Sequence, residues 1–296
     1  MLLISILGML YLLTDPVFTT SQHNVDGQTL QAPTKNLAGV NTFPNGLSPS
    51  NRSLIPLNGL TIGASEVRCH ARYGLTPNID DCWNAIHYVQ RSEIEVTFAE
   101  RDTSPGPRIF RLPFRLMGDK AQCYFQPVLE VGERTGSASF NEIRTAAAAL
   151  ISQCGIGAGQ GGIASHIGGD DHLALVLGTY QPNIKCSGTL TSWASCRDIL
   201  SGMPAMPGHV TLGPSTDPPF QVTLPKTLSS DDNKCHMKIW TSDGFGDSTT
   251  WYKIWEVVTA VYSVCARHAQ GGSFSRFGDI GRLSITLSDS LTVEEA

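Results

Sequence analysis

The eight cysteines of this 296-residue chain fall into two sets of four with nearly the same spacing. Successive cysteines are 13, 41 and 31 positions apart in the first set and 10, 39 and 30 in the second. No Cys-x-x-Cys pair is present, so neither a zinc ribbon nor a thioredoxin-type motif is supported. An even number of cysteines in this arrangement predicts two disulfides within each set. The residues concerned are Cys69, Cys82, Cys123, Cys154, Cys186, Cys196, Cys235 and Cys265.

The residues between the cysteines repeat as well, which indicates a tandem duplication. A Leu-Pro pair ends ten residues before the third cysteine of each set, at Leu112-Pro113 and at Leu224-Pro225. An aromatic residue stands 14 positions before each fourth cysteine, and a glycine pair follows that cysteine. A repeat of about 110 residues corresponds to a whole domain and not to one unit of a solenoid. We therefore predict two homologous domains, at residues 61–180 and 181–291.

Each repeat has the same predicted order of elements: a short helix, three strands, a longer helix and a final strand. The longer helices carry apolar residues at helical spacing over residues 140–154 and 251–265. The first begins with a capping-box sequence, Ser139 to Glu142, which the second lacks. This order predicts an α+β fold of two tandem homologous two-layer α/β sandwiches. Each would have two helices on one face of a mainly antiparallel sheet and would be linked by disulfides.

Three disulfide pairings are possible within a set of four cysteines. If the two helices of a repeat run antiparallel, the cysteine at the start of the first helix lies near the cysteine at the end of the second. The second cysteine of each set should then pair with the fourth, and the first with the third. The expected pairs are Cys82–Cys154, Cys69–Cys123, Cys196–Cys265 and Cys186–Cys235.

The amino-terminal residues predict export. Residues 2–13 form an apolar run that is too short to span a bilayer as a helix and that fits the core of a secretory signal peptide. No Lys or Arg precedes this run, so a misassigned start or a buried strand is the alternative. We predict a signal peptide at residues 1–20 and a flexible Asn-, Ser- and Pro-rich spacer at residues 21–60. The spacer holds a glycosylation sequon at Asn51, and the predicted location is extracellular.

Composition and motifs exclude several functions. Only 16% of the residues are charged and the formal charge is −5, whereas nucleic acids and anionic membranes require clustered Lys and Arg. No second apolar segment approaches membrane length, so stable membrane insertion is not expected. The chain lacks a Gly-x-Ser-x-Gly elbow, a His-Glu-x-x-His helix and a Walker loop. We therefore assign no catalytic residue and no cofactor, and expect that the protein is not an enzyme.

The densest group of potential metal ligands follows the longer helix of the first repeat. It consists of His166, Asp170, Asp171 and His172. The corresponding positions of the second repeat carry no ligating side chain. A solvated polar turn explains the group better than a metal site does, so no metal centre is predicted.

Trp240 is the best candidate for a binding residue. It lies on the predicted strand that follows Cys235, where period-two alternation places His236 and Lys238 on the same face as Trp240. An aromatic side chain beside polar neighbours is typical of a surface that binds a partner or stacks against a sugar. Burial of Trp240 at the contact between the two domains is the alternative interpretation.

Three features together resemble a broad group of secreted, cysteine-containing proteins of filamentous fungi, most of which have no assigned function. These features are the Leu-Pro strand before a cysteine, the aromatic-x-x-Ile helix that ends in a cysteine, and the Gly-Gly…Gly loop before a final strand. They cover about residues 69–288. The domain plan is also similar to that of fungal necrosis-inducing effectors and killer-toxin-like proteins, which are small disulfide-linked α/β sandwiches.

The resemblance implies a secreted, non-catalytic effector-like or toxin-like protein that acts on an extracellular protein or a cell-wall glycan. The alternative is a cell-wall protein that binds or hydrolyses carbohydrate.

Overall fold

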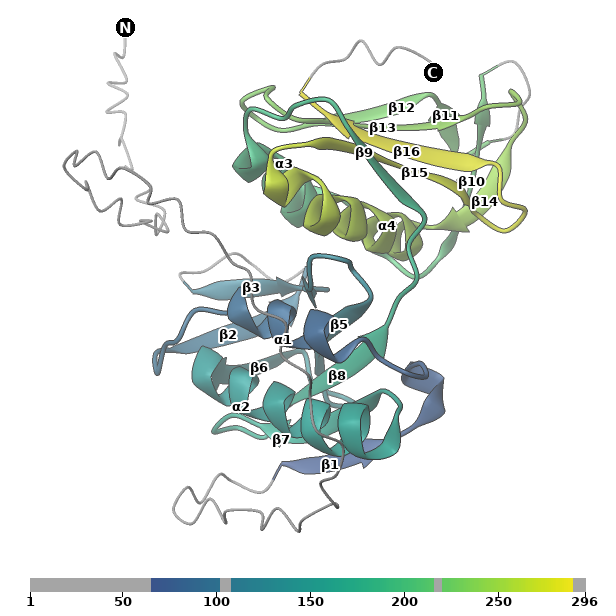
Figure 1. Cartoon of the computed structure of the whole chain (residues 1–296). Helices are drawn as coiled ribbons and strands as arrows, with labels where there is room; N and C mark the ends of the chain where they lie inside the picture. The colour runs from purple at the N-terminus through teal and green to yellow at the C-terminus, as the bar shows by residue number, and fades with distance from the viewer. Residues whose placement is uncertain (1–64, 102–107, 216–219, 290–296) are drawn as a thin grey trace, which may run out of the picture. The chain divides into compact units, whose positions relative to one another are not determined.

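The computed structural model describes residues 65–101, 108–215 and 220–289 (Figure 1). Within these residues it is an α+β structure with four α-helices and four mainly antiparallel sheets, which confirms the α+β class that the sequence predicted. The predicted signal peptide, the spacer and Asn51 lie outside the described residues.

Residues 65–179, called here the first half, contain the elements from β1 to β8. The strands are β1 (Glu66–Cys69), β2 (Glu95–Glu100), β3 (Ile109–Leu112), β4 (Leu116–Met117), β5 (Cys123–Leu129), β6 (Thr135–Ser139), β7 (Gly162–Ile167) and β8 (Leu173–Thr179). The helices are α1 (Ile79–His87) and α2 (Phe140–Leu150), with a 3-10 turn at Ala71–Tyr73 and a π-helical segment at Ile151–Ala158.

Residues 184–289, the second half, follow a short connector of residues 180–183. The strands are β9 (Ile184–Ser187), β10 (His209–Pro214), β11 (Val222–Leu224), β12 (Lys226–Ser229), β13 (His236–Thr241), β14 (Asp247–Thr250), β15 (Gly271–Phe277) and β16 (Leu283–Ser288). The helices are α3 (Trp193–Gly202) and α4 (Trp251–Val264), and a 3-10 turn at Ala266–His268 follows α4.

Both halves arrange their strands in the same order. The five-stranded sheets are β1-β7-β8-β5-β4 and β9-β15-β16-β13-β12, and the three-stranded sheets are β3-β2-β6 and β11-β10-β14. Strands β2 and β3 pair in parallel, as do β10 and β11. The sequence predicted one sheet in each repeat. The structure has two in each half, because β2 and β10 have both edges occupied by the strands of their own small sheets.

Each half encloses its own hydrophobic core. In the first half Phe98, Phe125 and Leu150 are fully buried together, and they come from the small sheet, the large sheet and α2. In the second half α4 and the large sheet supply a corresponding cluster that contains Ile254 and Ile285. Figure 1 shows α3 and α4 on the same side of that sheet. Two separate cores are consistent with the domains predicted at residues 61–180 and 181–291. The division of the chain into these two domains stays a prediction.

All eight cysteines form disulfides within their own sets, as predicted, but the predicted pairing is wrong. The bonds are Cys69–Cys154, Cys82–Cys123, Cys186–Cys265 and Cys196–Cys235. The contact on which the prediction rested is present in the first half, since α1 also contacts the π-helical segment that contains Cys154. It does not fix the pairing, because both elements also lie against strands that carry the other two cysteines. In the structure α1 contacts β5, and the π-helical segment that follows α2 contacts the edge strand β1.

The second glycine of each pair makes room for the disulfide of the longer helix. A Cβ atom on Gly162 would lie 2.5 Å from the Sγ of Cys154, and one on Gly272 would lie 2.7 Å from the Sγ of Cys265. Carbon and sulfur do not approach this closely without a bond, so a larger residue would displace the helix from the sheet. The close approach accounts for the repeated glycine pair.

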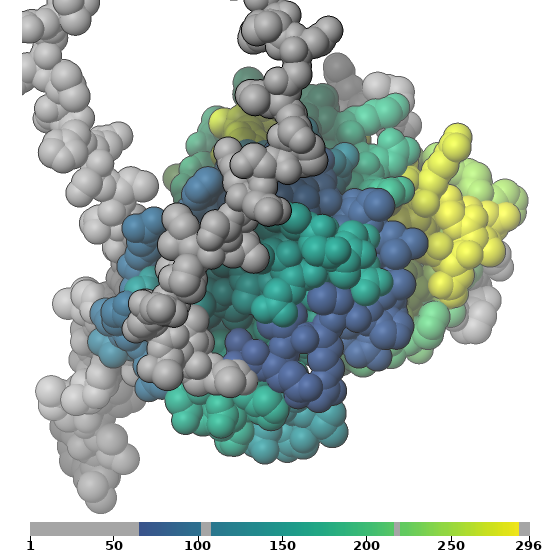
Figure 2. Space-filling model, turned by 60° about the horizontal axis from the view of Figure 1, so that its bottom comes forward, coloured from purple at the N-terminus to yellow at the C-terminus, as the bar shows by residue number. Residues whose placement is uncertain are grey.

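In both halves a left-handed residue follows the cysteine at the end of the longer helix, but the number of positions between the two differs. Five positions separate Cys154 from the left-handed Gly159, whereas four separate Cys265 from the left-handed Ala269. The π-helical segment takes in the additional residue, because i→i+5 hydrogen bonding holds one more residue in a turn. Figure 2 shows teal residues of this part of the chain beside purple-blue residues of the amino-terminal part of the first half.

A carboxylate ties the first helix of each half to the loop before the third cysteine. In the first half Asp81 of α1 is buried, and it accepts hydrogen bonds from the backbone N–H groups of Lys120, Gln122 and Cys123 at 2.8, 2.7 and 3.0 Å. Buried backbone N–H groups need an acceptor. Asp81 supplies it and holds α1 beside the Cys82–Cys123 bond.

In the second half the carboxylate comes from the loop and not from the helix. The helix carries Ser195, whose hydroxyl donates to Asp232 of the loop at 2.7 Å. Asp232 also accepts hydrogen bonds from the Ser230 hydroxyl at 2.7 Å and from the backbone N–H of Lys234 at 3.1 Å. The hydrogen bonds from Ser230 and Ser195 lower the pKa of Asp232 to about 2.

Asp232→Asn should lower the melting temperature at neutral pH and have little effect in strong acid. Since hydrogen bonds depress the folded-state pKa of Asp232 from 3.8 to about 2, its contribution to stability is complete above the higher value. It is lost as the pH falls through the lower one. Thermal unfolding of both proteins across this range measures the effect. The exposed neighbour provides the control Asp231→Asn, and an undiminished difference in acid would contradict the prediction.

The double variant Cys82→Ser/Cys123→Ser should lose about 4 kcal/mol of folding free energy, because the bond closes a loop with a sequence separation of 41. Denaturant titration measures this loss. Non-reducing peptide mapping of the wild-type protein should join the peptide of Cys69 to that of Cys154. Recovery of Cys69 joined to Cys123 would show that the pairing described here is wrong.

Candidate functional site: sheet faces, the contact between halves, and the connector

The candidate metal ligands of the first half hold a loop in place. Asp170 accepts hydrogen bonds from the backbone N–H and the hydroxyl of Ser137 at 2.8 and 3.0 Å, and from the backbone N–H of His172 at 3.2 Å. It therefore joins the β7–β8 loop to β6. His166 and Asp171 both have left-handed backbone conformations, with φ of 58° and 59°. His166 lies in β7 where the pairing with β8 is irregular, and Asp171 lies in the β7–β8 loop.

The second half makes the same junction with a carboxylate from the opposite side. Asp247 of β14 is buried and accepts hydrogen bonds from the backbone N–H groups of Ile280 and Arg282 in the β15–β16 loop, at 3.2 and 2.9 Å. Asp170 and Asp247 thus join the same pair of elements in the two halves. Asp170 does so from the loop, and Asp247 does so from the strand that the loop contacts. In the described part of the chain, no three His, Cys, Asp or Glu side chains come together so that they could hold a metal ion.

Trp240, Lys238 and His236 share one face of β13. Met237 and Ile239 between them are fully buried beneath the helices, so the three candidate residues lie on the outer face of the sheet. Lys238 and Trp240 are half-buried, whereas His236 is buried.

Two of these side chains are tied to neighbouring strands. The indole Nε1 of Trp240 donates to the hydroxyl of Thr286 on β16 at 3.1 Å. Nδ1 of His236 lies 2.8 Å from the hydroxyl oxygen of Ser229 on β12. Lys238 is left as the flexible member of the group.

The outer face of the second sheet is rich in hydroxyl groups. The strand register aligns Trp240 with Ser284 and Ser275, and it aligns Lys238 with Thr286 and Ser273. This face is defined here by Lys185, Thr227, Ser229, His236, Lys238, Trp240, Ser273, Ser275, Ser284, Thr286 and Ser288. Its formal charges are those of Lys185 and Lys238.

The outer face of the first sheet, in contrast, contacts helix α4. Tyr124 and Gln126 of β5 stand one and three residues after their third cysteine, as His236 and Lys238 do. Gln126 exchanges hydrogen bonds with the hydroxyl of Tyr252 on α4 at 3.0 and 3.1 Å. The positions that correspond to the candidate binding residues therefore form the contact between the halves.

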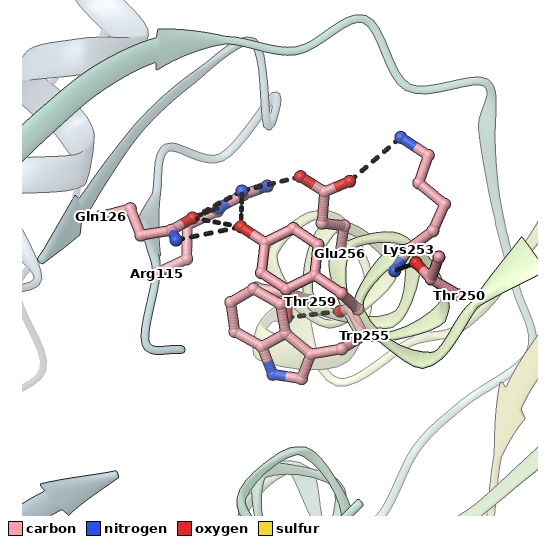
Figure 3. Close-up of polar contacts among 8 residues, drawn as sticks. Arg115, Gln126, Thr250, Lys253, Trp255, Glu256 and Thr259 are labelled. Atoms are coloured by element: carbon pink, nitrogen blue, oxygen red, sulfur yellow. Dashed lines mark hydrogen bonds and ion pairs between the residues drawn. The ribbon is translucent and has the colours of Figure 1, made fainter. Parts of the chain in front are cut away.

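Arg115 lies at the centre of this contact (Figure 3). Its side chain is only 2% exposed, and a terminal nitrogen lies 2.8 Å from Oε1 of Glu256 on α4. The guanidinium also donates to Oε1 of Gln126 at 3.0 and 2.6 Å, and it lies 3.9 Å above the ring of Tyr124. A buried charge needs such partners because removal from water is costly. The charge of Arg115 thus binds the first sheet to α4.

Arg101 makes a second link between the halves. Its guanidinium donates to the carbonyl oxygens of Leu200 at 2.8 Å and of Ser201 at 3.1 Å, and also to that of Met203. These carbonyls stand at the end of α3, where helical oxygens lack partners within the helix. Burial and the nearby charge of Arg111 lower the pKa of Arg101 to about 10, so it remains charged at neutral pH.

Arg267 makes a third link, from the 3-10 turn after α4. It donates to the carbonyl oxygen of Met117 at 3.1 and 3.2 Å and lies 3.9 Å above the ring of Tyr88. A nitrogen of Arg267 is also 3.8 Å from a carboxylate oxygen of Asp119. Sequence reasoning missed all three arginines, because no local pattern indicates which carbonyl or carboxylate of the other half lies nearby.

Two hollows flank the connector. The larger, of about 570 Å³, is lined by neutral residues that include Asn78 and Gln122. The smaller, of about 490 Å³ and called here the charged hollow, is lined by residues that include Lys253, Arg276 and Asp279. Tyr180 lines both. Burial, with the nearby charge of Glu256, raises the pKa of Tyr180 to about 12, so its hydroxyl stays protonated at neutral pH.

Among the described residues, no helix is long and apolar enough to cross a membrane. The four disulfides fit an extracellular protein. Comparison with protein-family models, with curated proteins and with solved structures found no match. Function is therefore inferred from the surfaces and contacts of the chain itself.

Arg115→Ala should destabilise the protein by about 3 kcal/mol, because it leaves Glu256 and Gln126 without a partner in a buried contact. Arg68→Ala is the matched control, since Arg68 pairs with Glu66 at 2.6 Å but both side chains are exposed. Loss of that pair should cost much less than loss of the Arg115 contact, because water screens both exposed charges. Chemical denaturation measures both changes, and equal losses would show that the Arg115 contact contributes no more than a surface pair.

Proposed function

We propose that this chain is a secreted, non-catalytic interaction protein that acts on a target at a cell surface through the outer face of its second sheet. One observation carries the proposal: the corresponding face of the first sheet contacts α4, whereas the face that carries Trp240 receives no helix of the described chain. An open sheet face whose counterpart already serves as a contact surface is suited to take a partner.

The chemistry of the open face suits a polar target. Two contact positions of the first sheet, Arg115 and Met117, correspond by their spacing from the third cysteine to Thr227 and Ser229. The second sheet has thus exchanged a helix-binding surface for hydroxyl and basic groups. Lys185 and Lys238 give this face a positive charge although the whole chain carries −5.

Export is part of the same proposal. The disulfides support it, as does the signal peptide predicted at residues 1–20. We also propose the two tandem sandwich domains, the glycosylation of Asn51 and the kinship with secreted fungal effector-like and toxin-like proteins. Each of these rests on the sequence patterns described above.

Binding of the labelled, secreted protein to intact cells tests the proposal. Lys185→Ala/Lys238→Ala should weaken binding by about tenfold, since each charge contributes about 0.5–1 kcal/mol. Lys226→Ala is the control, because this exposed lysine of β12 aligns with the buried Ile239 and not with the outer face. Equal binding by all three proteins would rule out the outer face as the contact surface.

A carbohydrate target is the second candidate, and the geometry of Trp240 favours it. The hydrogen bond from Nε1 to Thr286 holds the indole across β16 and among the serines and threonines of the face. An aromatic ring held beside hydroxyl groups can stack against a sugar ring while its neighbours bond the sugar hydroxyls.

A glycan array probed with wild-type protein and with Trp240→Ala distinguishes this candidate. We expect Trp240→Ala to reduce glycan binding by about tenfold through loss of ring contact. Trp193→Ala provides the control, since Trp193 is 45% exposed on α3, away from the outer face. Unchanged glycan binding by Trp240→Ala would reject the sugar-stacking role.

A further inference from the structure

The charged hollow has the size and the walls of a small-molecule site. Its volume of about 490 Å³ lies within the range that such sites occupy. Aromatic rings of Tyr180, Phe274 and Phe277 contribute to its lining. Phe274 and Phe277 belong to β15, and their rings contact each other at 6.2 Å between centroids. The hollow therefore offers an apolar wall against which a ring can lie.

The charges around this hollow leave one cation available. Lys253 is engaged with Glu256, whose Oε2 lies 3.0 Å from Nζ. Asp279 accepts a hydrogen bond from the Ser248 hydroxyl, and its carboxylate is 3.6 Å from Nδ1 of His209. Arg276 is exposed and, among the residues that the structure describes, its guanidinium has no hydrogen-bond or ion-pair partner. A free guanidinium at such a wall is a ready partner for an anion.

The first half fills the corresponding corner with its own carboxylates. Glu142 there stands where the second half has Lys253, and its Oε2 accepts hydrogen bonds from the backbone N–H and hydroxyl of Ser139 at 2.7 and 2.9 Å. Glu95 likewise stands where the second half has His209. Glutamates in one half are thus replaced by a lysine and a histidine in the other. The second half has lost the internal carboxylate of Glu142 at this corner and gained the ammonium group of Lys253 and the carboxylate of Asp279, where the first half has Gly169.

Polar groups suited to hydroxyl ligands complete the hollow. The side chains of Gln181 and Thr250 line it, and the hydroxyl of Tyr180 is available as a donor at neutral pH. Asp279 can accept further hydrogen bonds from a ligand, because a carboxylate has several lone-pair positions. An aromatic wall, a guanidinium and these groups match a ring that carries both hydroxyls and a carboxylate.

We infer that the charged hollow binds a carboxylated sugar, with the carboxylate on Arg276 and the ring against Phe274 and Tyr180. This site is separate from the outer face of the second sheet, and the inference does not depend on the function proposed for that face.

Isothermal titration of the full-length secreted protein with glucuronate, glucose and acetate tests the inference. Glucuronate should bind, while glucose, which lacks the carboxylate, and acetate, which lacks the ring, should each bind at least about tenfold more weakly. Arg276→Ala should weaken glucuronate binding at least about tenfold through loss of a charge-assisted hydrogen bond. Arg276 has a left-handed backbone conformation, with φ of 64°, which glycine adopts more readily than alanine. Arg276→Gly therefore serves as a second variant with the same expected result.

Controls separate this site from the outer face and from general charge. Trp240→Ala and Lys226→Ala should both bind glucuronate as the wild type does. Absence of glucuronate binding, equal binding of acetate, or full binding by Arg276→Ala and Arg276→Gly would each overturn the inference.

Discussion

A buried guanidinium organises the described part of this chain. Arg115 is almost completely removed from water, and its charge is satisfied by Glu256, by Gln126 and by the face of Tyr124. Because an unpaired charge at this depth would cost several kcal/mol, the outer face of the first sheet and α4 have to meet with these groups aligned. That contact decides which surfaces are used within the chain. It commits one sheet face to a helix and leaves the corresponding face, which carries Trp240, for another task.

The same backbone segments are held in both halves, but the carboxylates that accept the hydrogen bonds come from different positions of the chain. The loop before the third cysteine is held by Asp81 from the helix in one half, and by its own Asp232 bonded to the helix hydroxyl of Ser195 in the other. The junction beside the final strand pair is made by Asp170 from one side and Asp247 from the other. A backbone N–H group requires an acceptor but not one from a particular position. Such exchanges leave the fold intact and change the positions of the charges on the surface around it.

Much of the architecture could be predicted from the sequence. Spacing indicated a duplication, the helical periodicity of residues 140–154 and 251–265, and the alternation that puts Met237 inside and Trp240 outside, because these patterns can be recognised in the sequence alone. The disulfide pairing could not be predicted: three pairings satisfy the same spacing, and the choice depends on which strand each helical segment packs against, β5 for α1 and β1 for the π-helical segment after α2. The structural role of the candidate metal ligands could not be predicted for a related reason. In the sequence, a carboxylate such as Asp170 looks like a metal ligand. Only the structure shows that it accepts hydrogen bonds from backbone N–H groups.

By itself the sequence determined the two helices of each repeat, the engagement of every cysteine within its own set, and the absence of a recognised catalytic motif. Only the tertiary structure decided which cysteines meet, which sheet face contacts α4, and which cation at the connector is left without a partner. The physical reason is the range of the interactions. Periodicity and capping act over a few residues and leave a trace in the sequence. The contacts of Arg101, Arg115 and Arg267 join residues about 100 to 150 positions apart, and no local pattern records them.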